Sequence, residues 1–121
     1  MIALLSPAKS LDFDAQDQTE ICTQPEFLEN SEYLVKKLRK ISPGKLSKMM
    51  KINPDLAGLN HQRYQSWDTP FTPSNSKQAL LAFRGDVYRG LAADTFSEKD
   101  LKYAQQHIRI LSGLYGILKP L

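Results

Sequence analysis

Two pairs of a capping residue and a proline, Ser42-Pro43 and Asn53-Pro54, most constrain the fold of this chain. Serine and asparagine accept hydrogen bonds from the first free amides of a helix, and proline is tolerated at the first helical position. Each pair therefore predicts a helix start. Apolar residues recur at helical spacing before and after the two pairs: Phe27, Leu28, Leu34, Val35, Leu38 and Ile41, then Leu46, Met49 and Met50, then Leu56 and Leu59. We expect three helices over residues 25–66, with Pro25 in the first turn and very short links.

The flanking regions predict short strands and one more helix. Ile2–Leu5 is an apolar run closed by Ser6-Pro7, which is typical of a buried strand. Ala79–Phe83 is a second such run, expected to be a strand after a helical turn at residues 74–79. Ser97–Asp100 resembles a capping box, and the helix after it keeps its spacing to Leu111. A chain of 121 residues has the length of a single domain. The fold class is therefore α/β (α+β), helix-rich with a few short strands.

Composition narrows the functional classes. No apolar run approaches the ~20 residues of a membrane helix, and the apolar start is too short for a signal peptide. We therefore expect a cytoplasmic protein without membrane contact. Cys22 is the only cysteine, and His61 and His107 stand without metal-ligand partners in the sequence. We expect no metal site and no cofactor.

Charge is strongly segregated along the chain. Residues 1–35 carry a net charge of −6, residues 36–51 carry +7 without a single acid, and residues 52–121 carry +2. A block of +7 is the kind of surface that attracts polyanions through counterion release. The alternative is a solvated surface that the preceding acidic block neutralises.

The segment Leu111–Leu118 allows two interpretations. A helix-hairpin-helix would have its first helix at residues 98–111, a turn from Ser112 to Gly116, and its second helix from Ile117. Gly113 and Gly116 would let backbone amides approach a phosphate, and the second helix would point its N-terminus at the same anion. The alternative is that Gly113 caps the helix and a buried strand, Leu114–Leu118, follows.

Two further motifs are candidates for chemistry. Ser6-Pro7-Ala8-Lys9 matches the S-x-x-K pattern of serine acyl enzymes, but their partner motifs are absent, which leaves Lys9 as a candidate anion ligand at a strand end. The segment Phe83–Gly90 predicts a polar cleft wall with Arg84 directed at an anion; the alternative is a surface pair of Arg and Asp in a turn.

Five segments together, in their order and spacing, resemble the YaaA family of bacterial peroxide stress proteins: LLSPAKSLDF, LAGLN, LLAFRGDVYRGL, TFSEKDLKYAQQH and RILSGLYGILKPL. The agreement runs from Met1 to Leu121. Members of that family are longer and continue past the equivalent of Leu121. The resemblance therefore implies that residues 1–121 are the N-terminal part of a single YaaA-like domain with an incomplete YaaA-like fold.

The resemblance implies a function that composition does not. The family is cytosolic, limits oxidative damage under hydrogen peroxide in association with lower free iron, and binds DNA through a basic cleft and a helix-hairpin-helix. In this chain the hairpin falls on Leu111–Leu118, and no position has an established catalytic role. We expect DNA backbone binding with little base specificity by Lys9, Arg84, Arg109, Gly113, Gly116 and Lys119. The alternatives are an enzyme acting on a small anionic substrate with Lys9, Arg84 and Asp86, and an incomplete domain without a function of its own.

Overall fold

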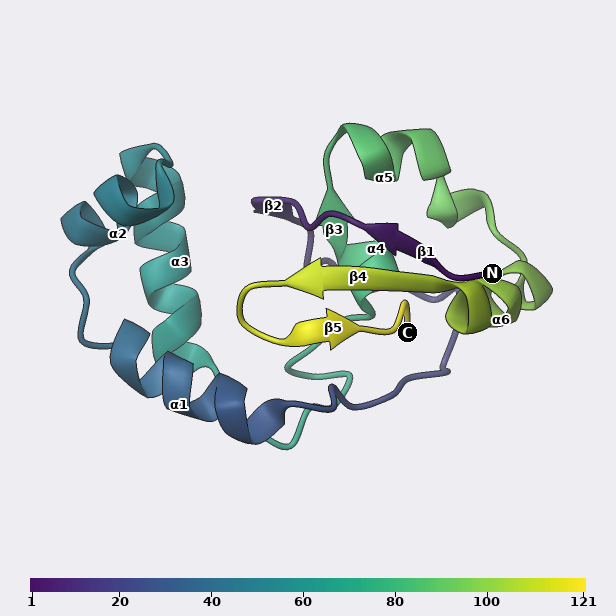
Figure 1. Cartoon of the computed structure of the whole chain (residues 1–121), viewed down its shortest axis with the longest axis horizontal. Coiled ribbons are helices and arrows are strands. Elements are labelled where there is room, and N and C mark those ends of the chain that lie inside the picture. The colour runs from purple at the N-terminus through teal and green to yellow at the C-terminus, as the bar shows by residue number, and fades with distance from the viewer. The chain divides into compact units, whose positions relative to one another are not determined.

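The computed structural model describes every residue from Met1 to Leu121, and its contacts divide the chain into two compact units. The helical unit is the continuous stretch Leu28–Pro70. The sheet unit joins Met1–Phe27 to Phe71–Leu121. Six α-helices, one 3-10 helix and five short strands make up the chain, which confirms the predicted α+β class (Figure 1). None of the helices combines the length and the apolar character that crossing a bilayer requires.

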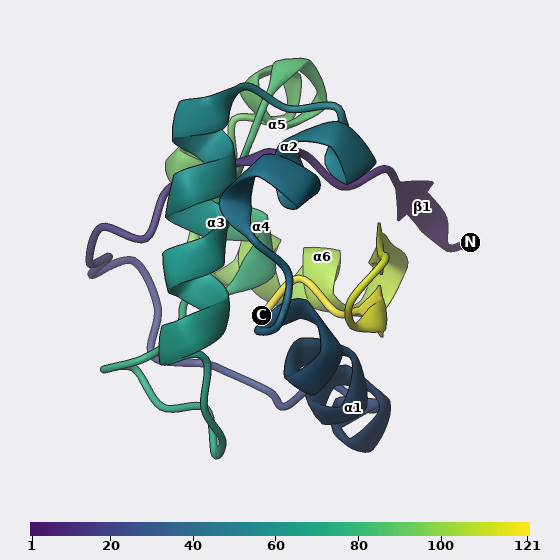
Figure 2. The same cartoon turned by 90° about the vertical axis from the view of Figure 1, so that its left-hand side faces the viewer.

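The helical unit contains the three predicted helices, α1 (Leu28–Leu38), α2 (Pro43–Met50) and α3 (Pro54–Ser66) (Figure 2). Both predicted caps are confirmed. Ser42 Oγ accepts a hydrogen bond from the Lys45 amide at 3.3 Å, and Asn53 Oδ1 accepts one from the Leu56 amide at 2.8 Å. In both helices proline occupies the first turn.

The predicted start of the first helix was wrong. Residue Pro25 precedes the helix, which begins only at Leu28 after a turn at residues 26–27. Gln24, the residue before Pro25, does not act as a cap, because its side-chain amide donates to the Phe71 carbonyl at 3.0 Å. A proline alone therefore does not start a helix here; the capping side chain before it is also needed.

The helical unit has its own small core, in which Ser31, Val35, Leu46 and Ala57 are buried. Arg39 connects the ends of two helices. Its Nε donates to the Tyr64 carbonyl at 2.8 Å, its Nη2 donates to the Trp67 carbonyl, and the link after α1 thereby lies against the end of α3.

The sheet unit is built on a three-stranded mixed sheet of order β1–β4–β5. Its strands are β1 (Ala3–Leu5), β4 (Ile108–Ser112) and β5 (Gly116–Leu118). Strand β1 confirms the first predicted strand and runs parallel to β4, with Leu4 opposite Arg109. The predicted burial of this strand was wrong, because Ile2 and Leu4 are exposed. Strand β5 runs antiparallel to β4, with Leu111 opposite Ile117. Ile110 is fully buried on one face, whereas Leu4, Leu111 and Ile117 are exposed.

A second, two-stranded sheet pairs β2 (Ser10–Leu11) with β3 (Phe83–Arg84) in antiparallel register. The expected strand at Ala79–Phe83 was wrong, because Ala79–Ala82 forms the helical turn α4. Leu80, Leu81 and Ala82 are all buried, and a helical turn can bury three consecutive side chains where a strand with one covered face cannot. Helix α5 (Asp86–Leu91) and the 3-10 turn η1 (Ala93–Thr95) follow.

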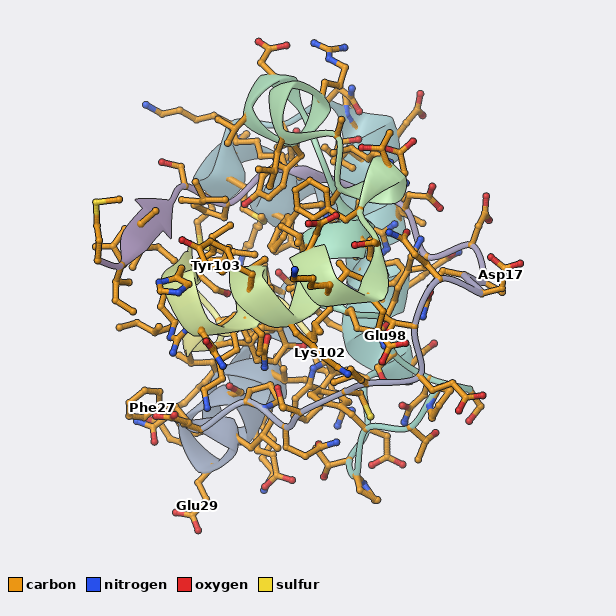
Figure 3. All side chains as sticks on the ribbon, turned by 90° about the vertical axis from the view of Figure 1, so that its right-hand side faces the viewer. Asp17, Phe27, Glu29, Glu98, Lys102 and Tyr103 are labelled. Carbon is orange, nitrogen blue, oxygen red and sulfur yellow. The ribbon has the colours of Figure 1, made fainter.

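The last helix, α6 (Glu98–His107), begins with the predicted capping box. Ser97 Oγ accepts from the Asp100 amide at 3.2 Å, and Asp100 Oδ2 accepts from the Ser97 amide at 3.0 Å. Glu98 and Lys102 form an exposed ion pair of 3.0 Å one turn further along the helix (Figure 3). The helix packs its Leu101 and Ala104 side chains into the core of the sheet unit.

The predicted helix-hairpin-helix at Leu111–Leu118 was wrong. Helix α6 ends at His107, and residues 108–118 form the β4–β5 hairpin with a turn at residues 113–115. Ile108 continues the helical spacing of Leu101 and Ala104, but Ile108 and Ile110 also alternate as a strand does. Pairing with β1, at the opposite end of the chain, decides between the two patterns. The alternative of a buried strand at Leu114–Leu118 is confirmed only in part: β5 covers Gly116–Leu118, and only Leu118 in it is buried. Gly113 lies in the turn and does not cap the helix.

Candidate functional site

The sheet unit joins the two motifs that the sequence singled out. Residues 10–12 pair antiparallel with residues 82–84, and the Tyr88 side chain of α5 reaches back to residue 6; we call residues 6–12 and 82–88 together the seam. The Tyr88 hydroxyl donates to the Ser6 carbonyl at 2.6 Å, Ser10 lies opposite Arg84, and the Asp12 amide donates to the Ala82 carbonyl at 2.7 Å. The structure therefore brings the backbone of the Lys9 segment beside that of Arg84, as a common binding site requires.

Gly85 is favoured here by its backbone conformation, because its φ of +137° lies in a region that side chains disfavour. Space is not the constraint: a Cβ at this position would lie in ordinary contact, 3.5 Å from the Ala8 Cβ. A helix beginning at Ser6, which the acyl-enzyme interpretation of Ser6–Lys9 needs, is not present: residues 6–8 have no regular structure. That interpretation was wrong, because the Ser6 carbonyl and the Ala8 side chain are both engaged along the seam.

Arg84 is held in place by its neighbours. Its Nη2 donates to Asp12 Oδ2 at 2.7 Å, and its Nη1 donates to the Leu81 carbonyl at 3.0 Å. The Asp12 carboxylate lies 3.9 Å from Lys77 Nζ through its other oxygen. The pKa of Asp12 is lowered, first by a hydrogen bond from the Asp14 amide and then by the one from Arg84. The carboxylate stays ionised and orients Arg84, whose side chain remains 47 % exposed.

The seam itself is electrically balanced: Lys9 and Arg84 contribute two positive charges, and Asp12 and Asp86 contribute two negative charges. Lys77, which lies outside these segments beside Asp12, adds one positive charge, but its side chain is only 8 % exposed. Lys9 is exposed in the bend between β1 and β2. Lys77 and Asp12 were not among the residues that the sequence predicted, because the pairing that gathers them joins segments far apart in the chain. Exposed Lys and Arg side chains of this kind can bind a phosphate group or a carboxylate.

The alternative interpretation of Phe83–Gly90 was a surface pair of Arg and Asp in a turn. Asp86 and Arg89 form such a surface pair, although in a helix and not in a turn. They form an exposed ion pair within α5, with 91 % and 74 % of their side chains accessible to solvent. Such pairs contribute little to stability because water screens them. Tyr88, on the same helix, is buried and stacks on Phe83 with the ring centroids 5.3 Å apart. Its burial raises the pKa of the Tyr88 hydroxyl, which remains a proton donor toward Ser6.

The four remaining predicted residues lie on or beside the β4–β5 hairpin, in a different sheet from the seam. Arg109 Nη1 donates to the Gln105 and Ile108 carbonyls at 2.8 and 2.7 Å, so this side chain caps the end of α6. Gly113 lies in the turn, Gly116 begins β5 with a φ of +75°, and Lys119 is exposed just after β5. The structure thus groups Lys9 with Arg84 and does not group the hairpin residues with them in one sheet.

Two surface hollows lie within the helical unit. The smaller, of about 180 Å³, is lined by Glu32, Val35, Lys36, Arg39, Trp67 and Asp68, and the larger, of about 320 Å³, by Glu29, Asn30, Tyr33 and Leu34. Neither is lined by a residue of the seam. His61 Nδ1 is 3.1 Å from the Ile41 carbonyl and His107 Nδ1 is 3.0 Å from the Met1 carbonyl, so both rings contact backbone. No three side chains of histidine, cysteine, aspartate or glutamate gather to hold a metal ion.

The structure is that of an α+β protein in which two short strands, β2 and β3, bring the segments of Lys9 and Arg84 together. A comparison with protein-family models identifies the family: the model described as peroxide stress protein YaaA matches residues 1–121, the whole chain. The chain belongs to this family of peroxide stress proteins, which confirms the resemblance drawn from its sequence segments.

Proposed function

We infer that this member of the peroxide stress family binds DNA through the phosphate backbone, with Lys9 and Arg84 of the seam as its central contacts. The observation that carries the proposal is the pairing of Ser10 with Arg84, which lays the segment of Lys9 beside the segment of Arg84. Asp12 fixes the direction of the Arg84 guanidinium, whose side chain stays 47 % exposed. Contacts of this kind bind backbone and not bases, so the binding has little sequence preference.

The wider role follows from the family. We propose that the protein acts in the cytoplasm, where DNA binding would help to limit iron-dependent oxidative damage under hydrogen peroxide. Two predictions from the sequence remain predictions. The first is that residues 1–121 are the N-terminal part of a single domain. The second is that phosphate is also contacted by Arg109, Gly113, Gly116 and Lys119. The glycines would then present amides from a hairpin turn, since the structure has no second helix there.

No observation favours the alternative of an enzyme acting on a small anion. That alternative needs a deep pocket in which Lys9, Arg84 and Asp86 converge. Asp86 is instead almost fully exposed and pairs with Arg89. An open surface with exposed Lys and Arg side chains suits a polymer backbone better than an enclosed small substrate.

A salt titration of DNA binding by the full chain tests the proposal. Fluorescence anisotropy of a labelled duplex gives the slope of log K against log salt. Lys9→Gln and Arg84→Gln are each expected to reduce the steepness of that slope by about 0.9 and to weaken binding to unrelated sequences alike. Arg89→Gln is the matched control, because Arg89 is exposed and paired only within α5. Salt-independent binding, or equal effects of Arg84→Gln and Arg89→Gln, would contradict the proposal.

A further inference from the structure

The positive charge of this protein is concentrated in the helical unit. Residues 28–70 carry eight bases and four acids, a net charge of +4, whereas the sheet unit carries eight bases and nine acids, a net charge of −1. Lys9 and Arg84 of the seam therefore lie in a unit of slightly negative charge. The largest electrostatic attraction for a polyanion must come from the other unit.

Four exposed lysines make up what we call the basic surface of the helical unit: Lys36 at the end of α1, Lys40 in the link after it, and Lys45 and Lys48 on α2. None of the four is held in an ion pair; the ion pairs of Asp12, Asp86 and Glu98 lie in the sheet unit. Lys36 lines the same hollow as Glu32 and Asp68. Glu32, at i,i+4 spacing from Lys36, instead accepts a hydrogen bond from the Thr69 hydroxyl at 2.9 Å.

The position of the lysines on α2 is unfavourable for the helix itself. Lys45 lies in the first turn, where the helix dipole is positive and where acids are preferred, and this turn contains no acid. Lys45 and Lys48 are three residues apart, so two like charges repel each other on one side of the helix. Folding does not explain this arrangement, whereas binding of an external anion relieves both effects.

The chemistry of this surface selects the kind of partner. A membrane surface requires an amphipathic helix whose apolar side is available, but α2 buries Leu46 completely in the core of its own unit. A protein partner would be recognised by aromatic or arginine anchors, and lysine is depleted from such interfaces. Arg39, the one arginine of the basic block, is occupied with the carbonyls at the end of α3. Tyr33 and Met49 are exposed on the same helices, but the four lysines outnumber them, and exposed lysines fit the phosphates of a nucleic acid.

We propose that Lys36, Lys40, Lys45 and Lys48 form a second nucleic-acid contact surface, which supplies most of the salt-dependent affinity while the seam fixes a phosphate locally. This inference rests on the proposed DNA-binding function. The inference goes beyond the proposed function by assigning the larger electrostatic contribution to DNA affinity to the helical unit.

The test compares two double variants of the full chain by the same anisotropy titration. Lys45→Gln with Lys48→Gln is expected to reduce the steepness of the salt slope by about 1.8 and to weaken binding about tenfold per lysine at about 0.1 M salt. Lys99→Gln with Lys102→Gln removes the same charge from α6 of the sheet unit and is expected to leave both quantities close to the wild type. The thermal stability of the α2 variant is expected to equal or exceed that of the wild type, because the repulsion within α2 is removed.

The outcomes separate the two proposals. If the α2 and α6 double variants behave alike while Lys9→Gln and Arg84→Gln weaken binding, the basic surface is overturned and the proposed function stands. If the wild type does not bind DNA even at low salt, the proposed function fails. Tighter binding of the wild type to phosphatidylserine vesicles than to DNA, lost in the α2 variant, would overturn the assignment of a nucleic acid as partner.

Discussion

Single residues in this protein owe their roles to partners that are distant in the sequence. Arg84 was predicted to bind an anion, and its side chain is exposed, but its direction is set by Asp12, which no local pattern marks. Arg109 was predicted on the same grounds, yet its guanidinium caps α6. Gly113 and Gly116 look equivalent in the sequence, but in the structure only Gly116 has a positive φ. The residue types predicted which side chains could bind an anion. Contacts between segments distant in the sequence determine which of those side chains are available to do so.

The two glycines of the β4–β5 hairpin allow a direct test at this scale. Gly116→Ala is expected to destabilise the protein by about 1–3 kcal/mol, because alanine is strained at this positive φ. Its Cβ would also lie 3.1 Å from the Phe27 ring. Gly113→Ala, where a Cβ meets nothing within 4 Å, is expected to change the stability by less than about 0.5 kcal/mol. Chemical denaturation measures both, and equal effects of the two variants would contradict this account of the hairpin.

Elements with local end signals were predictable, and elements without them were not. Helices α2, α3 and α6 begin where Ser42, Asn53 and Ser97 accept backbone hydrogen bonds, and a capping side chain followed by a favourable first turn is visible in the sequence. Strand β4 has no such signal, since its isoleucines fit a helix or a strand until β1 pairs with it. The same holds for α4, whose continuous apolar run has no periodicity to read.

The capping box of α6 predicts a pH dependence of stability. Hydrogen bonds from Ser97 lower the pKa of the Asp100 carboxyl below its ordinary value of 3.8. A lowered folded pKa means that the contribution of Asp100 is fully present above about pH 4 and is lost as the pH falls through the folded pKa. The melting temperature of Asp100→Asn should therefore lie below that of the wild type at neutral pH, and the gap should close under acid conditions. If the difference in melting temperature between the two proteins does not change with pH, the charge of Asp100 does not contribute to stability.

At the scale of the whole molecule, the chain has two cores. Val35, Leu46 and Ala57 are buried within the helical unit, while Leu80, Leu101 and Ile110 are buried within the sheet unit. The sequence predicted the apolar residues of both cores but not their division, because the sheet unit is assembled from the two ends of the chain. The lysines of the basic surface belong to the helical unit, and Lys9 and Arg84 belong to the sheet unit.

Two matched core variants test the division. Leu46→Ala and Leu101→Ala each remove a fully buried leucine side chain and are expected to destabilise by about 2–5 kcal/mol. Native-state hydrogen exchange should show the loss of protection centred on residues 28–70 for Leu46→Ala and on the sheet unit for Leu101→Ala. Uniform loss of protection along the chain in both variants would mean that the units unfold as one.

The parallel pairing of β1 with β4 has a consequence for the order of folding. It joins residues 3–5 to residues 108–110, so closing this contact requires nearly the whole chain, whereas the helical unit closes its contacts within one continuous stretch. Loop closure over long separations is slow compared with local helix packing. During synthesis, β1 therefore waits, without its partner strand, until β4 has emerged from the ribosome.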